Sequence, residues 1–449
     1  MLNTSLWLRY AALLIYAIVL VYSYEILSRW WGYFGFTYWL REEYKAYAMC
    51  FVATLPALLL PRNIKSFSVF CAYIIFALVF LPCMLVPLMQ QSRGEGHAML
   101  LFLTVFISSV VFILTCRIPL KPLPTVRIPA KYFWAGFAGA YVLLTVLVVY
   151  QFGGQLRLVG VDDIYVQRFA GGEAAGGRFI LYAVAFLSNV FNPFLIVAGL
   201  ATRRRWLVAV GTLGQILMFA TLAARSTVLS PFLIIGAWYL FRRTGTSTGL
   251  AVSSALTGAV IILLPFLASY NPVGGGLNLL LTIVYFRTLL ISGAAFGVYD
   301  SFFSFNPHTY LSHSIMGRYF ADYPYGDYSV GEVVGLFLTP TFGRNILEYN
   351  ANFLATDGIA AFGLLGVPVA ALVLAIVLVL LNRAVPRAKT GLASAMAIPF
   401  LISISNGSLF ASMLTGGGLL LALLIYLSDD ALGLDRTIAK GKAEEVEPQ

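Results

Sequence analysis

The stretch Ser66 to Met89, SFSVFCAYIIFALVFLPCMLVPLM, carries no charge and exceeds the roughly 20 apolar residues with which a helix crosses a bilayer. Similar apolar runs recur along the chain, in which 60% of the 449 residues are hydrophobic and only 11% are charged. The mean hydropathy of +0.86 excludes a soluble multidomain protein. The sequence therefore predicts an all-α polytopic membrane protein.

Twelve apolar runs are predicted to span the membrane, and they cover residues 6–26, 46–60, 66–89, 99–116, 132–152, 179–201, 206–223, 227–241, 250–269, 352–381, 391–405 and 409–427. The run 278–305 is also apolar enough to span. Counting it would move the basic linker after Leu381 to the opposite side from the other basic linkers. We therefore predict that this run lies outside, in interfacial or re-entrant helices.

Short basic linkers set the expected orientation, because loops rich in Lys and Arg stay in the cytoplasm. They follow the second, fourth, sixth, eighth and tenth predicted spans and contain no Asp or Glu. Both termini are therefore expected in the cytoplasm. The predicted division is residues 1–269 for spans one to nine with an external loop at 153–178, 270–351 for an external lobe, 352–428 for spans ten to twelve, and 429–449 for a disordered cytoplasmic tail.

The predicted outer face carries ten Arg and a single Lys, Lys45, whereas the inner face carries twelve Arg and six Lys. A face charged only for solubility should contain more Lys. Arg grips phosphate through a planar, bidentate fork and stays charged when it is partly desolvated. The imbalance therefore predicts an outer site for phosphate, and its candidate side chains are Arg168, Arg225, Arg287, Arg318 and Arg344.

Position distinguishes four of these Arg residues. Arg225 lies where two predicted spans meet with almost no loop, and Arg287 interrupts an apolar external segment, a costly place for an unpaired charge. Arg168 lies between an acidic pair and a glycine-rich stretch, and Arg344 lies just before a span. A competing interpretation stays open, in which Arg168 and Arg344 only anchor at headgroups or pair with nearby carboxylates.

No metal or cofactor motif is evident in the sequence. Cys50, Cys71, Cys83 and Cys116 all fall within apolar runs, where Cys acts as a small hydrophobic residue, and the three His residues show no metal-ligand spacing. The chain also lacks a Walker loop, a dinucleotide fingerprint and the internal repeat of many transporters. We expect no metal, no cofactor and no nucleic-acid partner.

A series of motifs from Val159 to Phe410 resembles the Wzy-type oligosaccharide repeat-unit polymerases, which include the O-antigen and enterobacterial common antigen polymerases. The resemblance is one of pattern and order. The motifs are IYVQRF at 164–169, NVFNPF at 189–194, ARS at 224–226, VYFRTLLISG at 284–293, GRNILEYNANF at 343–353 and DGIAAFGLLG at 357–366.

This resemblance implies a metal-independent glycosyltransferase with a GT-C-like membrane fold, working on the periplasmic face of the bacterial inner membrane. It would transfer a growing glycan from undecaprenyl diphosphate to a new lipid-diphosphate-linked repeat unit, with a chain-length regulator and a flippase as candidate partners. Arg225 and Arg287 would stabilise the negative charge on the leaving diphosphate. Two alternatives stay open: a glycan ligase of related fold, and a flippase or other transporter of lipid-linked glycans.

A group that accepts the proton of the acceptor hydroxyl would complete such a site. The outer candidates are His308, His313, Asp322, Glu332 and Glu348. We favour His313, because the side chain of His titrates near neutral pH. A solvated loop His is the competing interpretation, and the reaction could also rely on stabilisation of the leaving group alone.

The segment FADYPYGDYS at 320–329 is rich in aromatic residues that could stack on sugar rings. An interfacial aromatic belt is the alternative explanation. The predicted glycan-binding side chains are Tyr323, Tyr325, Glu332 and Glu348.

Overall fold

The computed structural model describes residues 4–157, 167, 170–172, 174–244, 247–272, 274–314, 317–339, 348–385 and 389–432, without the side chains of Arg178 and Arg225. The regular secondary structure in these ranges is entirely helical, with no strand, which confirms the predicted all-α class. It divides into two compact units. Unit 1 comprises Met1–Pro119, Thr244–Val379 and Leu401–Ser412, and unit 2 comprises Leu120–Arg243, Leu380–Phe400 and Met413–Gln449.

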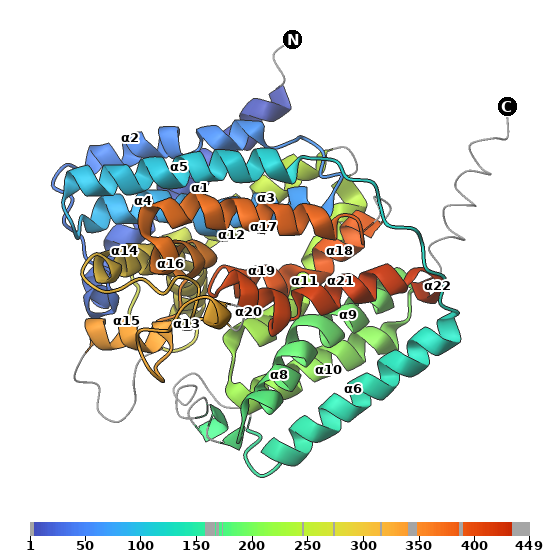
Figure 1. The fold of residues 1–449 in the computed structure, drawn as a ribbon. Helices are drawn as coiled ribbons and strands as arrows, with labels where there is room; N and C mark the ends of the chain where they lie inside the picture. The colour runs from blue at the N-terminus through green and yellow to red at the C-terminus, as the bar shows by residue number, and fades with distance from the viewer. Residues whose placement is uncertain are drawn as a thin grey trace, which may run out of the picture. The chain divides into compact units, whose positions relative to one another are not determined.

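Unit 1 contains the N-terminal helices, the helices of the predicted lobe and the helices on either side of it. Figure 1 shows α2, α4 and α5 running side by side in this unit. The helices and helical turns are α1 Thr4–Trp31, η1 Gly32–Phe34, α2 Glu43–Ala53, η2 Leu55–Leu59, α3 Phe67–Ile75, η3 Phe76–Phe80, α4 Leu81–Gln90, α5 Glu95–Cys116, α12 Thr248–Leu267, α13 Leu277–Leu281, η6 Thr282–Leu290, α14 Ile291–Phe303, η7 Gly317–Tyr319, α15 Val330–Leu338, η8 Leu354–Ile359, α16 Ala360–Phe362, η9 Gly363–Leu365 and α17 Gly366–Leu381, with parts of α19 Ile398–Ile404 and α20 Leu409–Leu414.

One end of unit 1 is basic. Arg117 donates a hydrogen bond to the Leu59 carbonyl at 3.1 Å, and the N–H of Gly249 donates to the Arg62 carbonyl at 2.9 Å. We call this the basic end, and it comprises residues 4–9, 59–68, 116–117 and 248–249. These residues include no Asp or Glu, which is the composition predicted for a cytoplasmic side.

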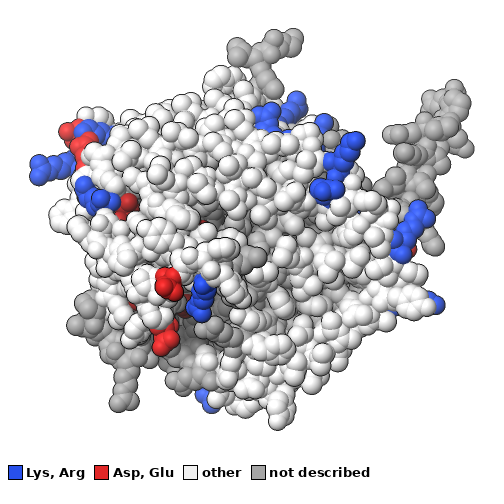
Figure 2. Space-filling view, in the orientation of Figure 1, with Lys and Arg blue, Asp and Glu red and all other residues white. Residues whose placement is uncertain are grey.

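The opposite end of unit 1 carries carboxylates. The N–H of Trp39 donates to the Met89 carbonyl at 2.9 Å, and Lys45 forms an ion pair with Glu95 at 2.9 Å. We call this the acidic end, and it comprises residues 25–45, 89–97, 267–282 and 300–301. Figure 2 shows charged side chains at the ends of α5 and none along the middle of its visible face, as expected of a surface in contact with lipid.

Ten helices within the described ranges are long and apolar enough to cross a membrane, so this is a multi-pass membrane protein. They are Thr4–Phe34, Phe67–Gln90, Glu95–Cys116, Ala130–Phe152, Phe179–Ala201, Arg205–Leu222, Thr248–Leu267, Leu277–Phe303, Leu354–Leu381 and Leu409–Leu427.

Three of the twelve predicted spans are missing from these ten. The prediction at 46–60 falls on α2, which has only 11 residues, and the prediction at 391–405 falls on α18 and α19, which have 7 each. The third, at 227–241, falls on α11, which has Arg at both of its ends. Nevertheless α2 and η2 together run from the acidic end to the basic end of unit 1, because Lys45 lies at the first and Leu59 at the second.

The helix Leu277–Phe303 is among the ten but not among the twelve predicted spans. Its 27 residues are long enough to span, although the sequence predicts that it lies outside the membrane. Both of its ends lie at the acidic end of unit 1. The Thr282 hydroxyl lies 2.9 Å from the Tyr270 hydroxyl, and Asp300 forms an ion pair with Arg93 at 3.3 Å. A helix that crossed the unit would instead finish at the basic end.

Between these two ends the segment passes into the unit. The hydroxyl of Tyr285 donates to the carbonyl of Val260, which lies within α12. Further along, Gly293 packs so closely on α4 that a Cβ would lie 2.3 Å from the Pro82 carbonyl oxygen, so only glycine permits this approach. The contacts therefore favour a re-entrant path, which is tolerated where protein surrounds the backbone.

Cysteine labelling in intact cells tests this path. If the segment is re-entrant, Gly275→Cys and Phe305→Cys should both react with a membrane-impermeant thiol reagent from outside, whereas Arg204→Cys should not. The native Cys residues give little background because all four are buried. Labelling of position 275 from one side and position 305 from the other would show instead that the segment crosses the membrane.

Unit 2 is built on closely packed helices. Figure 1 shows α10 beside α9, and the two approach where a Cβ on Gly211 would lie 2.7 Å from the Asn192 carbonyl oxygen. The helices and helical turns are α6 Ala130–Phe152, α8 Arg178–Phe186, η4 Leu187–Phe191, α9 Asn192–Ala201, α10 Arg205–Leu222, α11 Arg225–Thr244, α18 Thr390–Met396, α21 Gly418–Leu427 and α22 Asp429–Leu432.

Proline explains two of the wide, π-helical turns. Pro82 follows η3 and Pro193 follows η4, and neither has an N–H to bond to the carbonyl four residues earlier. In unit 2 the residue before the proline, Asn192, accepts a hydrogen bond from the Tyr141 hydroxyl at 3.0 Å. The Asn-Pro motif is therefore a packing feature of α6, α9 and α10.

The predicted disordered tail begins too early at 429. Asp429–Leu432 forms α22, while residues 433–449 lie outside the described part of the chain. The start of α22 is held by Lys389, a buried side chain that donates to the Ile425 carbonyl at 2.7 Å and forms an ion pair with Asp429. An ion pair in an apolar region explains why these residues are ordered.

Removing one partner of this pair should destabilise unit 2. Asp429→Ala would leave the Lys389 ammonium buried without its counter-charge, at a cost of about 3–5 kcal/mol. We expect a lower melting temperature for the purified protein in detergent, and little change for the neighbouring Asp430→Ala. Equal melting temperatures for the two variants would mean that the Lys389 ammonium is solvated.

Candidate functional site

Of the five Arg residues predicted to bind phosphate, only Arg287 and Arg318 have described side chains. Arg168 and Arg344 lie outside the described residues, and Arg225 is the first residue of α11 but its side chain is not described. Two other Arg residues of the predicted outer face are engaged in ion pairs: Arg29 with Glu25 at 2.9 Å, and Arg93 with Asp300 at 3.3 Å.

Arg287 lies in η6 among aromatic rings. Its guanidinium carbon is 5.4 Å from the centre of the Phe34 ring and 5.1 Å from that of Phe286, distances typical of cation–π contact. The Arg287 side chain is half-buried. The rings of Trp31 and Phe286 stack beside it, with their centres 4.2 Å apart. Burial raises the pKa of the neighbouring Tyr349, and the Arg287 charge partly lowers it. The aromatic rings therefore restrain the orientation of this cation.

Arg318, Tyr323 and Tyr325 belong to the loop between α14 and α15. Arg318 is exposed, and burial raises the pKa of the nearby Tyr323 to about 12, although the Arg318 charge acts in the opposite direction. The Tyr325 hydroxyl donates to the Pro307 carbonyl at 2.6 Å. The hydroxyl of Tyr323 is buried without a hydrogen-bond partner in the described chain, so it could serve a sugar hydroxyl.

The two predicted glycan-binding carboxylates differ. Glu332 forms a capping box with Ser329: its carboxylate accepts from the Ser329 N–H at 2.6 Å, and its own N–H donates to the Ser329 hydroxyl at 3.2 Å. This is a structural role at the start of α15. Glu348 is exposed and lies beside Tyr349.

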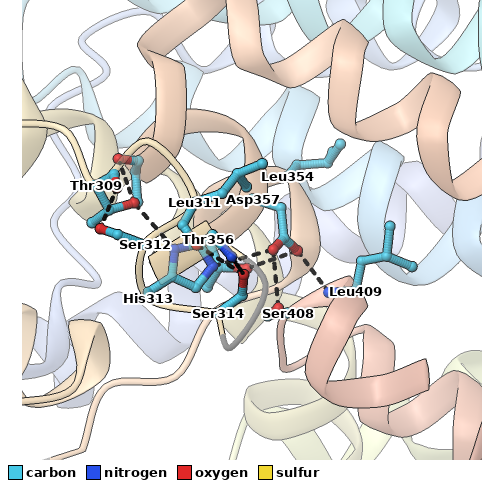
Figure 3. A network of polar contacts seen from close by, with 12 residues as sticks. Thr309, Leu311, Ser312, His313, Ser314, Leu354, Thr356, Asp357, Ser408 and Leu409 are labelled. Carbon is cyan, nitrogen blue, oxygen red and sulfur yellow. Dashed lines mark hydrogen bonds and ion pairs between the residues drawn. The ribbon is translucent and has the colours of Figure 1, made fainter. Parts of the chain in front are cut away.

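His313 and Asp357 form the most developed polar network of unit 1 (Figure 3). His313 Nε2 lies 3.2 Å from Asp357 Oδ1, which also accepts from the Ser408 hydroxyl at 2.9 Å. The second oxygen of Asp357, Oδ2, accepts from the N–H of Leu409, the first residue of α20, at 2.6 Å. Asp357 is buried, so these donors replace water around its carboxylate.

The local sequence explains how Asp357 is held. Asn352 begins the turn before η8, where its side-chain oxygen accepts from the Leu354 N–H at 2.9 Å. Its amide donates to the Ser292 carbonyl at 2.9 Å, which fixes the turn to α14. The motif NANF at 350–353 therefore has a structural role. It holds η8, which contains Asp357, against α14.

The other ring nitrogen of His313 is also engaged. Nδ1 lies 3.1 Å from the hydroxyl oxygen of Thr309, and this hydroxyl lies 3.2 Å from the Ala360 carbonyl. A hydroxyl has one hydrogen, so Thr309 donates either to a neutral His313 or to Ala360. In the second case a protonated Nδ1 can donate to Thr309. Both protonation states of His313 can therefore be fully hydrogen-bonded.

A second His–Asp contact lies at the acidic end of unit 1. His97 Nε2 is 2.8 Å from Asp300 Oδ2, and Arg93 contacts the same buried carboxylate. These residues fasten the end of α14 to the turn between α4 and α5, as does the hydrogen bond from Ser301 to Ser92 at 2.8 Å. These contacts indicate a structural role, in which they hold the segment that carries Arg287 in place.

Sequence reasoning selected His313 but not its partners. Asp357 lies within the DGIAAFGLLG motif, and no motif of the sequence singles out Ser408. An acidic residue within the first turns of an apolar run is the one available signal, because an unpaired carboxylate there would be costly. Within the described ranges no group of three His, Cys, Asp or Glu side chains could hold a metal ion.

Comparison with known proteins adds no family. No family model, no curated protein and no solved structure matches this chain.

Proposed function

We propose that this protein is a polysaccharide polymerase that transfers a growing glycan from undecaprenyl diphosphate to a lipid-diphosphate-linked repeat unit. The observation that best supports the proposal is the His313–Asp357 pair, a potential acid–base group held by buried donors in a multi-pass membrane protein. Arg287, held between aromatic rings, supplies a restrained cation in the same unit. The proposal places the site on the periplasmic face of the bacterial inner membrane, in a GT-C-like fold with a periplasmic lobe at 270–351.

The reaction is a single displacement in this proposal. The oxygen of the acceptor hydroxyl attacks the anomeric carbon of the donor sugar, and the bond from that carbon to the diphosphate oxygen breaks. The electron pair leaves with the diphosphate, where Arg287 offsets the charge. The Thr309 hydroxyl gives its proton to Nδ1 of His313 and takes the acceptor proton in its place, and Asp357 stabilises the imidazolium.

A direct assay tests the proposal. Purified protein is incubated with a synthetic undecaprenyl-diphosphate repeat unit, and the products are separated by size. A ladder of glycans that differ by one repeat is the expected result. Transfer to a lipid A-core acceptor without a ladder would identify the alternative ligase activity.

A flippase or other transporter is less well supported. Such a protein needs charged or polar groups along a passage through the membrane. The described carboxylates of unit 1 instead lie at its acidic end, in the segment between α14 and η8, or in the Asp357 network. Movement of a fluorescent lipid-linked glycan across vesicles that contain the purified protein, without any ladder, would favour transport.

A further inference from the structure

The helix α17 and the preceding turn η9 present an apolar stripe that begins near Asp357, because a Cβ on Gly366 would lie 2.2 Å from the carbonyl oxygen of Gly358. The outward side chains of this stripe recur at helical spacing and are between 37% and 81% exposed: Leu365 of η9, and Val369, Leu372, Val373 and Ile376 of α17. The opposite side of the helix is buried in the protein. From Leu365 to Ile376 the stripe is about 17 Å long at the rise of an α-helix. Figure 2 shows no charged side chain over this helix.

Just before the N-terminal end of the stripe, residues 361–362 contact Tyr310, which belongs to the predicted lobe. The N–H of Tyr310 donates to the Ala361 carbonyl at 3.2 Å, and its ring contacts the ring of Phe362 with centres 6.0 Å apart. Both rings are partly exposed, Tyr310 by 56% and Phe362 by 42%. They therefore extend the apolar surface of α17 onto the lobe.

The backbone at this junction is strained. Tyr310 and Leu311 have φ angles of 47° and 65°, a left-handed conformation that costs free energy for residues other than glycine. The conformation directs Tyr310 onto Phe362 while Thr309, one residue earlier, faces His313 at 3.1 Å. Such strain persists where the surrounding structure requires it, which is common at ligand sites.

We propose that the stripe Leu365–Ile376, topped by Tyr310 and Phe362, binds the isoprenoid chain of the lipid-diphosphate substrate. This inference rests on the proposed function for the identity of the headgroup. A long hydrocarbon chain with a polar end fits the arrangement, because the stripe is apolar along its length and meets the His313–Asp357 network at one end. Arg318, an exposed cation in the same loop as His313, provides the charge that a diphosphate requires.

Any bilayer lipid could cover an apolar helix, so the test must separate substrate from bulk lipid. The photoreactive residue p-benzoylphenylalanine is placed at Val369, which is 53% exposed, and at the matched control Ile107 of α5, which is 57% exposed. Each variant is irradiated with radiolabelled undecaprenyl diphosphate and, separately, with radiolabelled phosphatidylglycerol. We expect several-fold more undecaprenyl diphosphate label at 369 than at 107, removed by excess unlabelled compound, and equal phosphatidylglycerol label at both.

Equal undecaprenyl diphosphate label at the two positions would overturn the inference and show that α17 faces bulk lipid. The readout does not need catalysis. A ladder in the polymerase assay with equal labelling would defeat this inference alone, whereas preferential labelling without a ladder would retain the lipid site and defeat the polymerase. As a second measurement, Leu365→Asn should raise the KM for an undecaprenyl donor but not for a donor with a short isoprenoid chain.

Discussion

Replacing His313 by glutamine should slow ladder formation about 100-fold to 10,000-fold, the usual contribution of a general base. Glutamine can still donate a hydrogen bond to Asp357, but it cannot accept a proton at near-neutral pH. The loss should therefore appear in kcat, with a melting temperature close to that of the parent protein. The measurement is the initial rate of repeat addition in the purified system.

A matched control is available in the same loop. His308 stacks on Phe303 with ring centres 6.0 Å apart and has no carboxylate partner among the described residues, so His308→Gln should retain most activity. Asp357→Asn should resemble His313→Gln, because an amide cannot stabilise an imidazolium as a carboxylate does. Normal glycan length and rate in His313→Gln would remove this side chain from the chemistry and leave stabilisation of the leaving group alone.

Arg287→Lys is expected to reduce the rate of repeat addition about 100-fold to 1,000-fold. This is the usual effect of removing one preorganised hydrogen-bond donor to an oxyanion that forms in the transition state. Lysine keeps the charge but loses the planar fork and its stacking on Phe34 and Phe286. Rates are compared at saturating donor, so that weaker binding does not hide the effect on kcat.

Arg29→Lys is the matched control. It measures the effect of an Arg-to-Lys change at a position outside the proposed site. The Arg29 side chain is 70% exposed and pairs with Glu25, one helical turn away, so the rate should not change. If Arg287→Lys polymerised at the parental rate, positive charge in general, or no contact at all, would suffice at that position.

Much of the fold could be predicted from hydropathy, and most of the site could not. Long apolar runs such as 66–89 became helices because a bilayer leaves no other partner for the backbone. Short or interrupted runs were harder, and 391–405 proved to be two short helices. For the segment Leu277–Phe303, length and hydropathy suffice for a span, whereas Thr282 and Asp300 both have contacts at the acidic end, so its external placement stays a prediction.

Site prediction was limited by distance along the chain. His313, Asp357 and Ser408 are far apart in sequence, and no periodicity predicts that they meet. Glu332 illustrates the opposite case. The spacing Ser329-x-x-Glu332 before an apolar run is a recognised capping signature, so the structural role of Glu332 at the start of α15 could have been predicted.

The bonds from Ser408 and Leu409 to Asp357 have a consequence for biosynthesis. A chain still being made contains His313 and Asp357 long before residue 409 leaves the ribosome and α20 is inserted. Until then the Asp357 carboxylate lacks two of its donors and cannot hold the His313 ring as it does in the finished protein. Proteins generally fold in the order in which they are synthesised. The protein would therefore complete its His313–Asp357 pair only after nearly all of its membrane helices are in place, and chains truncated before 408 should form no ladder in the polymerase assay.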